Sequence, residues 1–407
     1  MTDLGSCRTF LGLRYRRNGT IEASNSMTAQ VSVIVPTFNR ARMLQECVAS
    51  LLRQTQPPME IIIVDDGSTD DTAETVRRMP PPVRYLHKPN AGKPAALNFA
   101  LPHASGEWIW FFDDDDVALP RAIEARLQAL AAAPDARVII SRFFWGENVA
   151  DGELLAGKAL QWPEFSARDF YRKFLRSCFA HLNGALIRSD RIAEVGDFRT
   201  DLLTSEDYDF TLRAARGEQI AICNEPTFIF RQHGGQRGPH GQRYSASERL
   251  RKFADGDAAI GRSIRSTHAL PEFLGLPAHQ ALDPLSQREA LLARLQVMAG
   301  KGLLAEVAAD AVALCQVSDQ LGAAIDPTTA AALKSACQER YLTFPLCETP
   351  GEALRSLAPL RSSAAGRTAL GLFARSVAGL AWWQKMTWVE RGRLAWLALR
   401  MRLLARG

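Results

Sequence analysis

Apolar residues in the first third of the chain form short continuous runs, and the stretches between these runs have helical spacing. The runs predict strands at 31–36, 59–66, 83–88, 107–112 and 136–144. The intervening stretches predict helices at 41–54, 70–79, 93–101 and 121–133. Strands that are apolar at every position are typical of parallel sheets with helices on both faces. The pattern therefore predicts an α/β fold with a doubly wound, mostly parallel sheet.

The rhythm changes twice further along the chain. Mixed structure follows from about 145 to 245, and from 246 onwards long Ala- and Leu-rich stretches replace the strands. A chain of 407 residues exceeds the usual size of one core. We therefore expect a flexible leader at 1–30, with Met27 as an alternative start, an α/β domain at 31–245 and a helical C-terminal domain at 246–407.

The composition is that of an ordinary soluble protein. Apolar residues make up 47% and charged residues 23%, the net charge is +5, and no uncharged apolar run is long enough to cross a membrane. The seven cysteines form no C-x-x-C pair, which disfavours a disulfide framework or a zinc ribbon. The N-terminus lacks the apolar core and cleavage site of a secretory signal. These features predict a cytoplasmic protein with reduced thiols.

Two acidic clusters follow predicted strands. Asp65 and Asp66 end the second strand, and four consecutive aspartates, 113–116, end the fourth. Ligands of open α/β sheets bind at the carboxyl ends of the strands. Adjacent carboxylates repel one another, so the clusters are either hydrated turns or sites for a cation. Because both lie at the same edge of one sheet, we favour a divalent cation bound together with a diphosphate.

Six segments in order carry a family resemblance. They are VSVIVPTFNR, EIIIVDDGSTDDT, NAGKPAALNFAL, GEWIWFFDDDDVALP, SEDYDF and FRQHGG. Together they resemble the inverting glycosyltransferases of family two, which have the GT-A nucleotide-diphospho-sugar fold. The resemblance covers roughly residues 31–240 and leaves the C-terminal region without a counterpart.

The resemblance implies a nucleotide-sugar site with Mn²⁺ or Mg²⁺ as cofactor. The residues that it places at the nucleotide sugar are Pro36, Thr37, Asn39, Asp65, Asp66, Asn90, Lys93, Asn98, Asp113 and Asp114. Asp66 would meet the nucleobase, with Asp65 as the alternative. Asp115 would bind the metal, with Asp114 and Asp116 as alternatives because four consecutive aspartates leave the register open. His233 would contact the metal or a phosphate.

A third acidic group begins a predicted helix in SEDYDF. Acidic residues also favour helix N-termini for electrostatic reasons alone. The resemblance implies that Asp207 is the general base and that Glu206 orients it or contacts the acceptor. The glycine-rich, basic segment 231–243 is either a linker or a lid over the diphosphate.

The C-terminal segment 382–407 has four tryptophans and six basic residues against one acid. Such a segment suits the surface of an anionic membrane, although a helix that packs on the helical domain is an alternative. We therefore expect a cytoplasmic protein that can lie peripherally on the inner face of a membrane.

The sequence predicts an inverting transferase that moves a sugar from a UDP-sugar to a hydroxyl of a carbohydrate or lipid-linked acceptor, in surface polysaccharide or glycolipid synthesis. A nucleotidyltransferase is an alternative, but it usually has a Gly- and Lys-rich segment where this chain has PTFNRAR. A non-catalytic scaffold with the same fold is the second alternative, and the complete set of acidic residues argues against it. Nothing in the sequence predicts a nucleic-acid partner.

Overall fold

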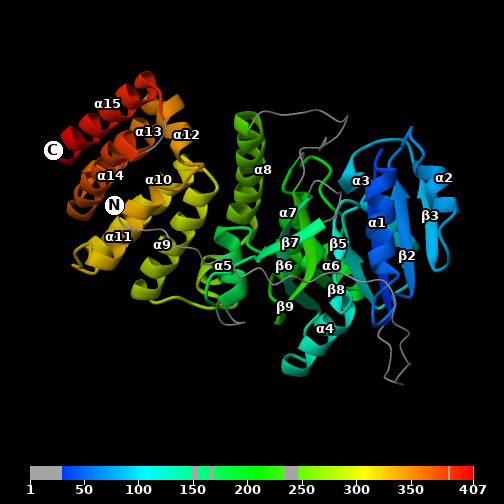
Figure 1. The fold of residues 1–407 in the computed structure, drawn as a ribbon. Coiled ribbons are helices and arrows are strands. Elements are labelled where there is room, and N and C mark those ends of the chain that lie inside the picture. The colour runs from blue at the N-terminus through cyan, green and yellow to red at the C-terminus, as the bar shows by residue number, and fades with distance from the viewer. Residues whose placement is uncertain are drawn as a thin grey trace, which may run out of the picture.

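The computed structural model describes residues 30–148, 154–165, 169–202, 204–232, 246–383 and 386–406. A sheet with its flanking helices occupies one end of the molecule, and a set of packed helices occupies the other (Figure 1). The predicted leader and most of the predicted lid, including His233, lie outside the described residues.

Nine strands form one sheet in the described part of the chain. Their bounds are β1 Val31–Thr37, β2 Glu60–Asp65, β3 Val83–His87, β4 Trp108–Phe111, β5 Val117–Ala118, β6 Val138–Asn148, β7 Leu154–Ala159, β8 Ala185–Arg188 and β9 Ile220–Gln232. Their order is β3-β2-β1-β4-β8-β6-β9-β5, with β7 paired to β6. The strands β3, β2, β1 and β4 are parallel, whereas β8 is antiparallel to both β4 and β6. The predicted mostly parallel α/β sheet is confirmed, but the fifth predicted strand, β6, is separated from β4 by the unpredicted β8.

Helices cover both faces of the sheet. They are α1 Ala41–Leu51, α2 Thr72–Arg77, α3 Lys93–Ala100, α4 Ala122–Gln128, α5 Phe170–Arg176, α6 Ser189–Val195 and α7 Glu206–Ala215. Side chains alternate along β1, so Val33 packs with α1 and α4 on one face while Ile34 packs with α3 on the other. This two-sided burial explains the long apolar runs of β1, β2 and β4.

The C-terminal region is helical, as predicted. Its helices are α8 Ala246–Thr267, α9 Pro284–Gly300, α10 Leu304–Gln320, α11 Pro327–Ala336, α12 Thr343–Glu348, α13 Pro350–Leu357, α14 Ala364–Trp383 and α15 Trp388–Ala405. One buried apolar cluster continues from the sheet through Phe174 of α5 to Leu295 of α9 and onwards to α15. A domain boundary near 245 stays a prediction. Within the described residues, every helix is too short or too polar to span a bilayer.

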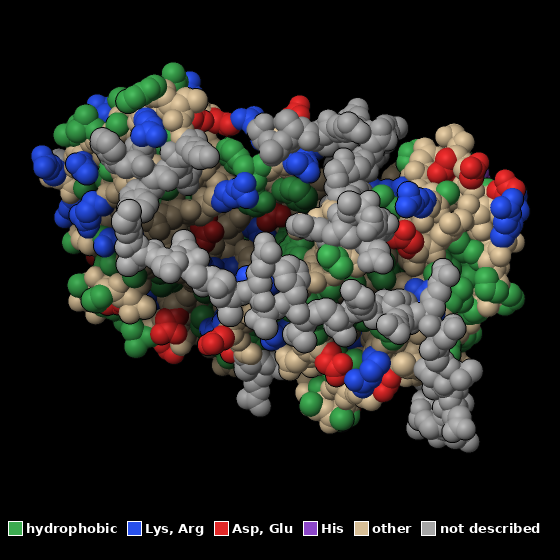
Figure 2. Space-filling model, in the orientation of Figure 1, with side chains coloured by type: hydrophobic (Ala, Val, Ile, Leu, Met, Phe, Trp, Pro, Cys, Tyr) green, Lys and Arg blue, Asp and Glu red, His purple; other side chains and the backbone are tan. Residues whose placement is uncertain are grey.

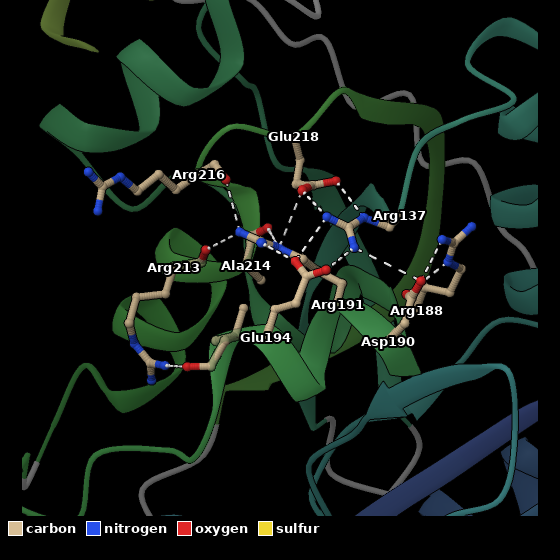
Figure 3. Close-up of polar contacts among 10 residues, drawn as sticks. Arg137, Arg188, Asp190, Arg191, Glu194, Arg213, Ala214, Arg216 and Glu218 are labelled. Atoms are coloured by element: carbon tan, nitrogen blue, oxygen red, sulfur yellow. Dashed lines mark hydrogen bonds and ion pairs between the residues drawn. The ribbon is translucent and has the colours of Figure 1, made fainter. Parts of the chain in front are cut away.

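Arginine side chains hold the C-terminal end of α7 against the sheet (Figure 3). Arg191 of α6 donates hydrogen bonds to the carbonyl oxygens of residues 213, 214 and 216, each at 2.9 Å. These oxygens belong to the last turn, where a helix offers them no partner of its own. Arg137, which directly precedes β6, pairs with Glu194 at 2.6 Å and with Glu218 at 2.7 Å, and these ion pairs join α6 and the α7–β9 turn to the start of β6.

A buried lysine of the helical region contacts the other end of α7. Lys301, directly after α9, is fully buried, and its Nζ donates to the hydroxyl oxygen of Tyr208 and to Oδ2 of Asp257, both at 3.0 Å. The Tyr208 hydroxyl donates in turn to the carbonyl oxygen of Phe174 at 2.6 Å. Tyr208 is the third residue of α7, so the helical region fixes the first turn of this helix.

Replacing Lys301 by Met tests this link. The substitution leaves Asp257 and Tyr208 without their buried donor, so we expect a loss of about 3–5 kcal/mol in the free energy of unfolding. Chemical denaturation measures it, and Lys334→Met, at an exposed lysine of α11, is the matched control and should change stability by less than about 0.5 kcal/mol. Equal stability of the two variants would contradict the role given to Lys301.

Candidate active site at the carboxyl ends of β1, β2 and β4

Three strand ends meet at one edge of the sheet. Thr37 at the end of β1 is paired in register with Asp65 at the end of β2, and the backbone N–H of Phe112 donates to the carbonyl oxygen of Ile34 at 3.0 Å. The aspartates that follow β4 therefore lie beside the end of β1. The Thr37 hydroxyl donates to Oδ2 of Asp114 at 2.7 Å, which fixes the loop to β1.

The aspartate run is not a hydrated turn, because Asp114, Asp115 and Asp116 are all buried. Two basic side chains from other segments supply opposite charge. Nη1 of Arg40, which directly precedes α1, lies 2.8 Å from Oδ1 of Asp114 and 2.9 Å from Oδ2 of Asp115. Nζ of Lys93, the first residue of α3, lies 2.5 Å from Oδ1 of Asp113.

The far end of β9 closes the loop from the other side. The backbone N–H of Arg231 donates to Oδ1 of Asp116 at 2.8 Å, and its Nε donates to the carbonyl oxygen of Asp115 at 2.7 Å. Asn183 Nδ2 donates to the second oxygen of Asp116 at 2.6 Å. Arg231 also pairs with Glu46 of α1 at 2.5 Å. The loop is therefore held by α1, α3, β9 and the turn before β8.

The pKa values of the buried aspartates show that their charge is costly. Burial raises the pKa of Asp114 to about 6 even though Arg40 opposes the shift. Burial and the neighbouring Asp115 raise the pKa of Asp116 well above its usual range. Additional positive charge at this loop would favour the ionised carboxylates.

Three of the four aspartates can hold a metal ion. Asp113, Asp115 and Asp116 each offer one carboxylate oxygen, and these oxygens lie within 4.8 Å of one another. Carboxylate oxygens are the hard ligands that Mg²⁺ and Mn²⁺ prefer, so the residues present fit a divalent cation. The geometry includes the predicted ligand Asp115 and the alternative Asp116, and it adds Asp113, for which the sequence predicted only a nucleotide contact.

The predicted nucleobase residues bind backbone and side-chain groups of neighbouring loops. Asp66 accepts hydrogen bonds from Lys88 Nζ at 2.6 Å and from the N–H groups of Ala91 and Gly92 at 3.0 and 2.7 Å. Asp65 accepts from the Ser68 N–H at 2.8 Å and from the Tyr85 hydroxyl at 2.6 Å. These bonds shape the loops after β2 and β3, and a contact of either residue with a base stays a prediction.

Among the other predicted nucleotide residues, Asn39 and Asn98 form hydrogen bonds with neighbouring segments of the chain. Asn39, at a φ of 54°, accepts from the Thr69 N–H at 2.7 Å and so joins the loops after β1 and β2. Asn98 forms two hydrogen bonds with the backbone of Phe198, at 2.8 and 2.9 Å, which gives its amide a structural task. Pro36 is buried within β1, and Asn90 is exposed beside the turn at Gly67. Of the predicted nucleotide residues, Thr37 and Lys93 contact the aspartate run directly.

The predicted base lies at the start of α7 and is linked to the aspartates through Lys93. Nζ of Lys93 lies 3.8 Å from Oε1 of Glu206 as well as 2.5 Å from Asp113. Burial raises the pKa of Glu206 to about 7, with Lys93 opposing and Asp207 adding to the shift. Oδ2 of Asp207 lies 3.5 Å from Nε2 of His181. The arrangement places three carboxylates and a lysine around one edge of the sheet.

Sequence reasoning missed Arg40 and His181. Arg40 directly follows the predicted nucleotide-facing loop, which is the one local signal that could have identified it. His181 lies in the segment 180–198, which resembles the family's stretch before the base, and the fold brings it to Asp207. The sequence pattern assigns Arg231 to the glycine-rich segment, whereas Arg231 belongs to β9 and its backbone N–H donates to Asp116.

Comparison with known proteins supports the resemblance to glycosyltransferase family two. Residues 32–192 match the family model described as Glycosyl transferase family 2. The chain is 38% identical over 226 residues to the glycosyltransferase GlyG of Streptococcus pneumoniae, covering 51% of this chain and 73% of GlyG. It is 32% identical over 225 residues to a hyaluronan synthase of Pasteurella multocida, covering 54% of this chain but only 22% of that protein.

A solved structure shares the fold. Residues 1–349 of S. aureus TarS, in complex with UDP-GlcNAc, superimpose with a TM-score of 0.50 at 18% identity, covering 86% of this chain and 92% of that one. Since the family match includes the strand ends and the aspartate loop, and GlyG is matched over most of its length, the chain belongs to glycosyltransferase family 2.

Proposed function

We propose that this protein is a metal-dependent, inverting glycosyltransferase that moves a sugar from a nucleoside-diphosphate sugar to a hydroxyl group. The observation that carries the proposal is the continuous set of ionisable groups from Asp115 through Asp113 and Lys93 to Glu206 and Asp207. This set offers a candidate cation site and a candidate base on one edge of the sheet, and transfer from a diphosphate donor needs both.

The donor class that we propose is a UDP-sugar, which rests on the family resemblance. The TarS structure contains UDP-GlcNAc, but the likeness to TarS shows the fold alone. We propose a carbohydrate or lipid-linked acceptor, with a role in surface polysaccharide or glycolipid synthesis. The hyaluronan synthase is named for a polysaccharide, but this chain spans only 22% of it, so this role is part of the proposal. We also propose a cytoplasmic location in which the protein lies peripherally on a membrane.

The proposed chemistry is a direct displacement at the anomeric carbon. Asp207 accepts the proton of the acceptor hydroxyl as that oxygen attacks, and the bond from the anomeric carbon to the diphosphate oxygen breaks, with its electron pair leaving on the nucleoside diphosphate. Asp115, with Asp113 and Asp116, would hold the divalent cation, which when bound stabilises the negative charge of the leaving diphosphate. Attack from the side opposite the leaving group inverts the anomeric centre.

Neighbouring side chains hold the base in place. Nε2 of His181 lies 3.5 Å from Oδ2 of Asp207, and the N–H of Tyr208 donates to the other Asp207 oxygen, Oδ1, at 2.8 Å. Lys93 keeps Glu206 and Asp113 close to one another. Family membership favours glycosyl transfer over nucleotidyl transfer, and a non-catalytic scaffold is the alternative that the following experiments exclude or support.

Calorimetric titration of UDP and GDP, with and without Mn²⁺, tests the donor site. We expect one nucleotide to bind in a metal-dependent manner and Asp115→Ala to weaken that binding by at least about tenfold, because a charged ligand of the cation is lost. Asp135→Ala, at an exposed aspartate outside the site, is the matched control and should bind as wild type does. Metal-independent binding, or equal binding by both variants, would contradict the site.

Replacing Asp207 by Asn tests the base. We expect turnover of the donor to fall by about 10²–10⁴-fold while nucleotide affinity stays unchanged, because only the proton acceptor is lost. Release of UDP or GDP from a panel of nucleotide sugars measures the rate, and Asp201→Asn, at an exposed aspartate just before α7, is the control. A variant as active as wild type would exclude Asp207 as the base.

The raised pKa of Glu206 predicts that the free energy of unfolding decreases as pH rises. Because the pKa rises from the usual 4.5 to about 7 in the folded chain, the folded state retains a proton that the unfolded state loses between these values. Stability therefore falls as pH rises through this window, and Glu206→Gln should remove this decrease. In buffer that contains a metal chelator, we expect Glu206→Gln to be more stable than wild type by up to about 3 kcal/mol at pH 8 and to differ little from it at pH 4.

Denaturation curves across pH 4–8 provide the measurement. Glu352→Gln, at an exposed residue of α13, should show no such trend. A stability difference between Glu206→Gln and wild type that is the same at every pH would contradict the buried, proton-retaining Glu206.

A further inference from the structure

The last helix, α15, has apolar residues on two opposite faces. Leu394, Leu397, Ala398 and Met401 are buried against the preceding helices. The opposite face is exposed, and we call its large apolar residues the exposed stripe: Trp388 (89% exposed), Val389 (64%), Trp396 (44%), Leu399 (56%) and Leu403 (50%). From Val389 to Leu403 these positions recur at intervals of three, four or seven, so they form one continuous line along the helix.

Arginines border the stripe on both sides. At 100° per residue, Arg393 and Arg400 project along one edge of the stripe, and Arg402 along the other. The one acidic residue of the helix, Glu390, is occupied in the N-terminal cap, where it accepts from the N–H and hydroxyl of Thr387 at 2.7 and 2.8 Å. The exposed face of α15 is therefore apolar along its centre and positively charged along both edges.

The positive charge along both edges of the exposed stripe determines which kind of partner can bind to it. A second copy of the chain, packed stripe to stripe, would bring the arginines of both helices together without an acid between them. An anionic lipid surface accepts both features, because the apolar side chains enter the acyl boundary while the arginine stems lie along it and their guanidinium groups reach the phosphates. Each such basic residue near an anionic surface adds to the attraction.

We propose that the exposed stripe of α15 and its bordering arginines bind the protein to the surface of an anionic membrane. Apolar and basic side chains gather at the end of the molecule where α15 lies, and acidic ones are nearly absent there in this view (Figure 2). That end is opposite to β1–β3 (Figure 1), so membrane contact through α15 leaves the strand ends uncovered. The proposal is independent of glycosyl transfer.

The test is flotation of the full chain with vesicles of phosphatidylcholine alone or mixed with phosphatidylglycerol. We expect the wild type to float with the anionic vesicles, less so at high salt, and only weakly with phosphatidylcholine. A variant with Trp396→Ser, Leu399→Ser and Leu403→Ser should bind at least about tenfold more weakly, because it removes three apolar side chains from the contact. Arg400→Gln with Arg402→Gln, at two exposed arginines, should weaken binding to anionic vesicles and reduce its salt dependence.

Three exposed leucines outside α15 supply the matched control. Leu155→Ser, Leu276→Ser and Leu285→Ser remove similar apolar surface, and this variant should float as wild type does. Substitutions are preferable to truncation because the buried face of α15 belongs to the core. A wild type that fails to float with anionic vesicles, or a stripe variant that floats equally well, would overturn the proposal. A wild type that dimerises through the stripe and ignores vesicles would overturn it in favour of a second copy.

Discussion

The structure depends on burying three of the four adjacent carboxylates at the end of β4. Such a loop is stable only if opposite charges and hydrogen-bond donors reach it, and they come from segments that are distant along the chain. Arg40 precedes α1, Lys93 begins α3 and Arg231 lies near the end of β9, and all three contact the loop. The same electrostatic demand thus brings three loops to one edge of the sheet. The neutralisation is incomplete, as the raised pKa values of Asp114 and Asp116 show, so the loop is suited to receive a cation.

The second constraint is the position of α7, whose first turn bears the proposed base. Arg191 satisfies the carbonyl oxygens at its C-terminal end, and the buried Lys301 contacts Tyr208 near its N-terminal end. One anchor belongs to the sheet region and the other to the helical region. The helical region therefore contributes to the geometry around Glu206 and Asp207, in addition to forming its own core.

The sequence predicted the parts of the fold that local patterns specify. Apolar runs identified the parallel strands β1, β2 and β4, because burial on both faces leaves few polar positions in them. The order of the acidic motifs identified the edge of the sheet. It did not predict β8, since a four-residue strand gives no periodic signal and pairs with partners distant in sequence. It also left the metal register open, because four consecutive aspartates look alike until the backbone directs Asp114 to Thr37 and Arg40. The two apolar faces of α15 obscured its amphipathic character for a similar reason, since only the packing shows which face is covered.

The central claim is that the aspartate loop after β4 binds a divalent cation together with the diphosphate of a nucleotide. Anomalous diffraction from crystals grown with Mn²⁺ and either UDP or GDP tests this most directly. The account predicts an anomalous peak at the carboxylates of Asp113, Asp115 and Asp116, with diphosphate oxygens as further ligands. A bound nucleotide without a peak at this loop, or a peak elsewhere on the molecule, would contradict it.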